Sequence, residues 1–121
     1  MIELGKGNAI VDKSFELALQ IIDFCELLTK QGNTVIAKQL LRSGTAVGAL
    51  VAESQHAESK ADFIHKMKIA VKEANETIYW LTLCEMSKSL PSNDDLKRIC
   101  KEAIKLLSKI IVSSKASIKN N

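Results

Sequence analysis

The chain is poor in the residues that bend and terminate β structure. Its 121 residues include one proline, five glycines and only 4% aromatic side chains. Sandwiches and barrels need frequent turn residues and strands rich in aromatic and β-branched side chains, so this composition argues against both. No apolar run approaches the ~20 residues needed to cross a bilayer, so we expect no membrane partner.

Aliphatic side chains, by contrast, are abundant. Hydrophobic residues make up 46% of the chain and charged residues 26%, which excludes a disordered tail. A chain of this length buries a core without disulfides or metals, and we interpret residues 1–121 as one domain. The aliphatic content nevertheless exceeds what a small bundle with one apolar stripe per helix requires.

The cysteines and the N-terminal residues suggest a reducing compartment. Residues 1–8 contain no apolar segment typical of a secretory signal, so we expect a cytoplasmic protein. The three cysteines, Cys25, Cys84 and Cys100, are odd in number and lie among aliphatic residues. Buried thiols are therefore favoured over a disulfide framework or a metal site.

Capping residues and apolar periodicity predict an all-α protein. Gln31-Gly32-Asn33, the capping-box-like Ser59 to Asp62, and Leu90-Pro91-Ser92 separate the predicted helices. The helices are expected at about 12–29, 33–55, 59–87 and 92–114, with an N-terminal arm at 1–10 and a frayed tail at 115–121. Short connections favour antiparallel neighbours, so we predict an up-down-up-down four-helix bundle.

Helical projection assigns apolar residues to faces. On the first helix, the residues at helical spacing are Phe15, Ala18, Leu19, Ile22, Cys25 and Leu28. On the second helix, one face holds Ile36, Ala37, Leu40, Leu41, Gly44, Val47, Gly48 and Val51, the expected core. Two glycines inside this helix each cost ~1 kcal/mol relative to alanine, which indicates close backbone approach.

The aliphatic surplus lies on a second stripe of each of the middle helices, here called the outer stripes. The outer stripe of the second helix comprises Val35, Gln39, Arg42, Ala46, Ala49, Leu50 and Glu53. That of the third helix comprises Ile69, Glu73, Glu76, Trp80 and Leu83. A bundle this small cannot cover a second apolar side itself, so we predict a homo-oligomer whose subunit interface is built from these residues. Arg42 is a candidate partner of Glu73 or Glu76.

The last predicted helix is strongly basic, although the whole chain carries only +3. Its cations recur every four residues and form one stripe, the basic stripe: Lys97, Lys101, Lys105 and Lys109, with Arg98 beside them. Cations at one-turn spacing can follow phosphates, giving salt-sensitive and sequence-independent binding of RNA or DNA. No aromatic residue interleaves, so this helix does not indicate base stacking. The alternative is an ordinary solvated helix face.

Catalytic and metal-binding motifs are incomplete. Glu53-x-x-His56 and Asp62-x-x-His65 partly match the Glu-x-x-His pairs of di-iron bundles, but the remaining ligands are missing and both pairs lie near a helix connection. No Cys–His pair or phosphate loop is present. We therefore expect no enzymatic activity, no cofactor and no small-molecule substrate; a metal-dependent bundle is the third alternative.

Several segments resemble a known family. Residues 39–49 (QLLRSGTAVGA) followed by Glu53, residues 59–66 (SKADFIHK), residues 69–81 (IAVKEANETIYWL) and residues 8–18 are similar to signatures of the bacterial 23S rRNA-intervening-sequence proteins. The resemblance implies an up-down bundle assembled into a ring-like homopentamer. A related group, the accessory proteins of diversity-generating retroelements, binds nucleic acid through a basic surface. Leu50 replaces the asparagine usual in the family, and no catalytic residues carry over.

These observations favour a non-enzymatic, homo-oligomeric helical scaffold that binds structured RNA or DNA electrostatically. The alternative is a protein–protein interaction module with no nucleic-acid role.

Overall fold

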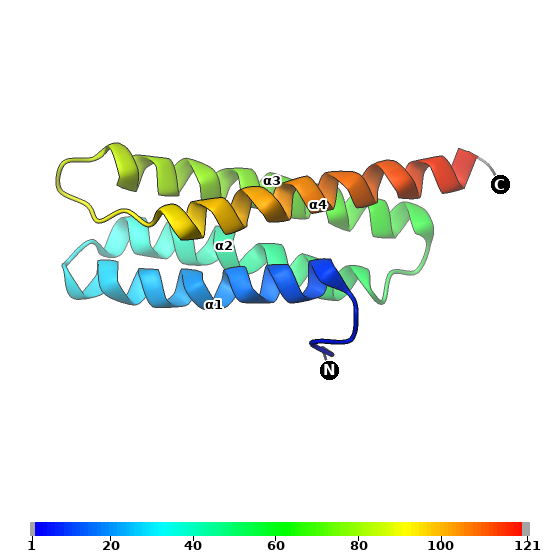
Figure 1. Cartoon of the computed structure of the whole chain (residues 1–121), viewed down its shortest axis with the longest axis horizontal. Coiled ribbons are helices and arrows are strands. Elements are labelled where there is room, and N and C mark those ends of the chain that lie inside the picture. Colours follow the sequence, from blue (N-terminus) through cyan, green and yellow to red (C-terminus); the bar gives the residue numbers. More distant parts are fainter. Residues whose placement is uncertain (1, 120–121) are drawn as a thin grey trace.

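The chain folds into an antiparallel bundle of four helices. The computed structural model describes residues 2–119, with α1 at Ala9–Lys30, α2 at Thr34–Ser54, α3 at Lys60–Met86 and α4 at Asp94–Lys119. Each helix reverses the direction of the one before it (Figure 1). Consecutive helices pack together, and α4 returns to pack on α1 and close the bundle. The predicted all-α, up-down-up-down four-helix bundle is confirmed.

Helix ends follow the local hydrogen bonds. The side chain of Asn8 accepts a hydrogen bond from the Val11 amide, so α1 begins at Ala9, three residues before the predicted start and within the segment expected to be an arm. Ser59 accepts from the Asp62 amide at 3.0 Å and caps α3 as predicted. Asn93 caps α4 in the same way, through the Leu96 amide.

The end of α4 differs from the prediction. Residues 115–119, expected to fray, are helical, and α4 runs to Lys119. Lys60 at the start of α3 donates to the Ser117 hydroxyl at 2.8 Å, which ties the last turns of α4 to α3. Figure 1 shows these turns extending past the start of α1. Residues 1, 120 and 121 lie outside the described residues.

The core is aliphatic, and its largest members come from all four helices: Leu17, Ile21, Leu28, Leu40, Met67, Leu96 and Leu107. The apolar residues that helical spacing predicted for one face of the first helix lie on two different faces of α1. Leu19 is 51% exposed and Ile22 is 39% exposed, whereas Ile10, Val11 and Phe24 are buried. Helix α1 therefore also carries a second apolar stripe, which the sequence had revealed only on the middle helices.

The two internal glycines of α2 allow α1 to approach closely. A Cβ on Gly44 would lie 2.7–2.9 Å from side-chain atoms of Ile21. A Cβ on Gly48 would lie 3.1 Å from the carbonyl oxygen of Ser14. The close backbone approach predicted for these glycines is confirmed, and it occurs within one bundle.

The cysteines are buried free thiols, as predicted. Burial raises the pKa of Cys100 to about 12 and that of Cys25 to about 11. The Cys100 thiol donates to the Ala74 carbonyl oxygen at 3.4 Å, inside the α3–α4 seam. In the part of the chain that is described, no helix has the length and apolarity needed to cross a membrane.

Candidate functional site

The basic stripe of α4 divides into two parts. At its start, Lys97 lies 2.7 Å from Glu85 of α3, and its side chain is only 19% exposed. Arg98 lies 2.7 Å from Glu102 on the next turn. The hydrogen bond from Lys97, followed by its charge, holds the pKa of Glu85 below its ordinary value. These two cations, here the paired end of the stripe, are already neutralised within the chain.

The remaining cations form the free end of the stripe: Lys101, Lys105 and Lys109. All three are exposed, and none forms an ion pair or hydrogen bond with any residue in the described range 2–119. The sequence could not show that Lys97 is paired, because Glu85 belongs to α3 and reaches Lys97 only across the seam. The geometry therefore reduces the candidate phosphate-binding set on α4 to three lysines.

The outer stripes of α2 and α3 come together along the seam between these helices. Arg42 bonds to Glu73 at 3.2 Å and also to Glu76, so both partners suggested by the sequence are engaged. The indole of Trp80 donates to Glu76 at 3.0 Å. Deeper in the same seam, the buried Thr77 hydroxyl donates to Ser43 at 2.9 Å. The polar members of the outer stripes thus bond to one another within one chain.

Exposure differs among the outer-stripe residues. Those on the open surface are Val35 (77% exposed), Gln39, Arg42, Ala49, Glu53 and Leu83. Those half-buried against the neighbouring helix are Ala46, Leu50, Ile69, Glu73, Glu76 and Trp80. A cleft of about 470 Å³ separates Val35 and Gln39 from Trp80 at the Gly32 end of the seam. Leu50 packs against the core, so it adds apolar contact inside the chain.

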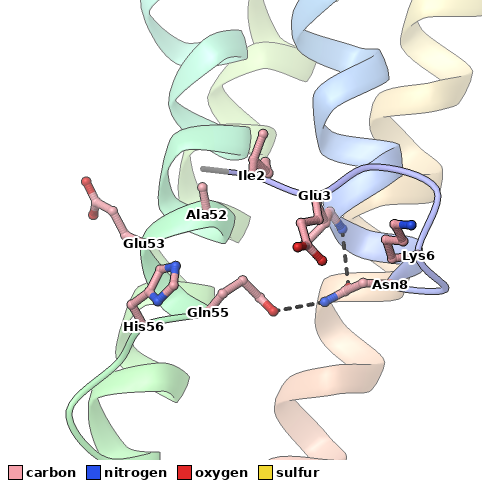
Figure 2. A pocket seen from close by; sticks show the side chains of 9 residues that line it. Ile2, Glu3, Lys6, Asn8, Ala52, Glu53, Gln55 and His56 are labelled. Carbon is pink, nitrogen blue, oxygen red and sulfur yellow. Dashed lines mark hydrogen bonds between the residues drawn. The ribbon is translucent and has the colours of Figure 1, made fainter.

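A pocket of about 590 Å³ lies between the N-terminal arm and the end of α2. The amide of Asn8 donates to Gln55 at 2.9 Å and fixes the arm there (Figure 2). Figure 2 also shows the carboxylate of Glu53 pointing away from the pocket, whereas His56 lies beside Gln55. The pocket therefore does not bring the two ends of the Glu53-x-x-His56 pair together.

In the second partial motif, Asp62-x-x-His65, the carboxylate of Asp62 already accepts two hydrogen bonds. Asp62 accepts from Lys66 at 2.8 Å and from the Glu58 amide at 3.2 Å. These hydrogen bonds, that of Lys66 first, lower the pKa of Asp62. Across residues 2–119, no three His, Cys, Asp or Glu side chains are grouped so that they could hold a metal ion.

Sequence reasoning missed an apolar strip along α1 and α2. Leu41 of α2, which the helical projection assigned to the core, is 40% exposed, and Leu19 and Ile22 of α1 are exposed as well. A groove of about 450 Å³ runs between Ile22 and Leu41. A projection of the first helix that allowed two apolar faces would have shown half of this strip. The other half depends on which face of α2 turns toward α1, which only the packing decides.

Comparison with known proteins places this arrangement in a family. The family model described as 23S rRNA-intervening sequence protein matches residues 6–111. A crystal structure of a protein of unknown function from the S23 ribosomal protein family of Bacteroides thetaiotaomicron is 42% identical, with a TM-score of 0.80. That similarity covers 84% of this chain and 97% of the other. No curated protein matches. The chain belongs to the 23S rRNA-intervening sequence protein family.

Proposed function

We propose that this chain is a non-enzymatic, cytoplasmic helical scaffold that binds RNA or DNA through α4. The observation that carries the proposal is the free end of the basic stripe. Lys101, Lys105 and Lys109 are exposed at one-turn spacing and form no ion pair within the described residues. The cations at the start of the stripe, by contrast, are neutralised, Lys97 by Glu85 and Arg98 by Glu102. Such a row can replace counterions along a phosphate backbone.

Salt-dependent binding tests this proposal. The probe is a labelled RNA hairpin, and its affinity is measured by fluorescence anisotropy between about 50 mM and about 200 mM salt. We expect the affinity to fall steeply with salt, and the triple variant Lys101→Ala, Lys105→Ala, Lys109→Ala to flatten the slope by roughly two to three units. Lys38→Ala on α2 serves as the surface-lysine control, and Lys97→Ala tests the paired end. No binding at the lowest salt would overturn the proposal.

We also propose that the scaffold assembles with copies of itself into a pentamer, as the resemblance to ring-forming family members implies. Three exposed apolar residues of the outer stripes support an interface at α2 and α3: Val35, Ala49 and Leu83. Light scattering on the purified chain measures the subunit number. We expect Val35→Glu with Leu83→Glu to shift the assembly toward monomer, whereas Leu19→Glu on α1 leaves it unchanged.

The second candidate is an interaction module for other proteins, without a nucleic-acid role. The groove between Ile22 and Leu41 supports it, because exposed aliphatic side chains flank it on both helices. Two results together would favour this candidate: a monomer by light scattering, and no nucleic-acid binding at low salt.

A further inference from the structure

The outward face of α3 next to α4 carries cations that match the free end of the basic stripe. One flank of α3 is fixed against α2 by the bonds of Arg42 to Glu73 and Glu76. The other flank is fixed against α4, where Lys60 meets Ser117 and Glu85 meets Lys97. Helices α3 and α4 pack against each other, and Figure 1 shows α4 crossing α3 at a shallow angle.

Helical geometry places three further residues on this outward face. Lys68, Lys72 and Tyr79 recur at four and seven residues and therefore share one face of α3. All three are exposed, and Tyr79 is exposed over 57% of its surface. By helical phase this face points outward between the α2 contact and the α4 contact, with Glu76 at its α2 edge, where the ring of Tyr79 also meets that of Trp80.

The two helices thus contribute to one surface. Across the antiparallel seam, Ala74 lies opposite Cys100 and Glu85 opposite Lys97, so Tyr79 lies at the level of the turn that leads to Lys101. Lys101 follows Lys97 by one turn and therefore shares the face of α4 from which Lys97 reaches Glu85 of α3. We call the surface made by Lys68, Lys72, Tyr79, Lys101 and Lys105 the α3–α4 patch.

The lysines of the α3–α4 patch form no ion pairs within residues 2–119. The acids that flank the patch are bonded to other cations, Glu76 to Arg42 and Glu85 to Lys97. An acidic chain that follows the seam therefore meets lysines from both helices. The exposed ring of Tyr79 adds a flat apolar surface, which a phosphate group cannot stack on but a base can.

We propose that the α3–α4 patch binds single-stranded nucleic acid, with the ring of Tyr79 stacking on a base and the lysines contacting phosphates. The inference deepens the function proposed above and rests on it. Grooves that combine cations with exposed aromatic rings hold single strands, because unpaired bases offer free faces for stacking. A duplex keeps its bases stacked inside and offers Tyr79 no such face. An acidic polypeptide would use the lysines but would gain no base stacking.

The test compares a labelled single strand with the duplex of the same sequence, in RNA and DNA versions. We expect the single strand to bind more tightly to the wild-type chain. Stacking on one base predicts that Tyr79→Ala weakens single-strand binding about tenfold and leaves duplex binding unchanged. Tyr79→Phe keeps the ring and restores the affinity. Circular dichroism confirms that each variant retains its helices, and Lys38→Ala remains the matched control.

The single tryptophan supplies a second readout. The rings of Trp80 and Tyr79 lie 5.0 Å apart and nearly perpendicular, so a base on Tyr79 changes the surroundings of the indole. We expect the single strand to change Trp80 emission in the wild type and in Tyr79→Phe, but not in Tyr79→Ala. Inorganic polyphosphate, which has no bases, should bind all three equally.

The outcomes separate the two proposals. Equal single-strand affinity of Tyr79→Ala and the wild type overturns the stacking role, as does tighter binding of the duplex. If lysine variants still reduce binding in that case, the proposed function stands. If neither strand binds at low salt but poly-glutamate does, both proposals fail and the surface is a protein-binding one.

Discussion

The two seams of α3 differ in how completely the charges beside them are paired. Toward α2, the carboxylates of Glu73 and Glu76 are bonded to Arg42, and Trp80 completes the group. Toward α4, Glu85 is bonded to Lys97, but the lysines of the α3–α4 patch form no ion pair among the described residues. Helix α3 therefore directs these acids to cations of its neighbours and leaves Lys68 and Lys72 on the open surface. The pairing of charges in this bundle therefore distinguishes surfaces whose charged groups are bonded within the chain from surfaces whose charged groups are accessible to a binding partner.

The exposed ion pairs contribute little to the stability of the bundle. Arg42 is more than half exposed, and exposed ion pairs contribute only about 0–1 kcal/mol. The buried contacts of the seams carry more free energy than the visible ion pairs.

The largest effect is expected from the thiols on raising the pH. Their pKa is raised in the folded state, to about 12 for Cys100 and about 11 for Cys25. The stabilisation is therefore complete below the ordinary thiol pKa and is lost as pH rises toward the folded value. We expect the free energy of unfolding to fall by roughly 1 kcal/mol per thiol between pH 8 and pH 10.

Urea denaturation under reducing conditions at several pH values measures this loss. Cys100→Ser removes the titrating group and keeps a donor for the Ala74 carbonyl oxygen. The variant should show a shallower decline than the wild type. An equal slope in both chains would show that Cys100 ionises as easily in the folded state as in the unfolded one.

Gly44→Ala should destabilise the α1–α2 seam by about 1–2 kcal/mol, after the gain in helix propensity is subtracted. The added methyl would overlap the β-branched Ile21, which is fully buried and has no room to move. Gly48→Ala is the matched control. Its Cβ would meet only the Ser14 carbonyl oxygen at 3.1 Å, so the loss in thermal or urea denaturation should be smaller. The reverse order would contradict the packing described here.

Thr77→Val should cost about 1 kcal/mol inside the α2–α3 seam. The substitution keeps the side-chain shape but removes the hydroxyl that is hydrogen-bonded to Ser43 at 2.9 Å, leaving the buried Ser43 hydroxyl with only its longer bond to the Leu40 carbonyl oxygen at 3.5 Å. Adding Ser43→Ala to Thr77→Val should recover part of the lost free energy of unfolding, because the Ser43 hydroxyl that lost its bond to Thr77 is then removed. Additive losses in the double variant would mean that the two hydroxyls do not interact.

The smallest effect tests the charge comparison directly. Glu85→Gln should release Lys97 into the patch and raise nucleic-acid affinity about twofold to fivefold at low salt, by adding one phosphate contact. Glu73→Gln removes the same charge from the α2–α3 seam, where Glu76 still holds Arg42. Anisotropy should therefore show a smaller change. Equal gains from both variants would point to net charge rather than to the position of Lys97.

The sequence predicts more of the fold than of the surface, for a physical reason. Caps and periodicity act locally, so Ser59 and the Gly32 break locate the ends of α2 and α3 to within a residue. On α1 both faces are apolar, and periodicity alone could not choose between Ile21 and Ile22 for the core. Only packing makes that choice.

The candidate site shows the same limit. The four-residue spacing of Lys101, Lys105 and Lys109 is local and was visible in the sequence. The neutralisation of Lys97 by Glu85 and the position of Tyr79 beside α4 depend on the register between helices. That register is set by contacts such as the one from Cys100 to Ala74, which no pattern within a single helix contains.

The closure of the bundle by α1 and α4 also has a consequence for the order of folding. Three seams join helices that follow each other in the chain, whereas Lys13 reaches Glu102 from the opposite end of the sequence, at 3.5 Å. Contacts between distant residues form against a larger loop entropy, so hairpins of neighbouring helices should assemble before the first and last helices meet. Substitutions at this closing seam should then accelerate unfolding while leaving the refolding rate almost unchanged.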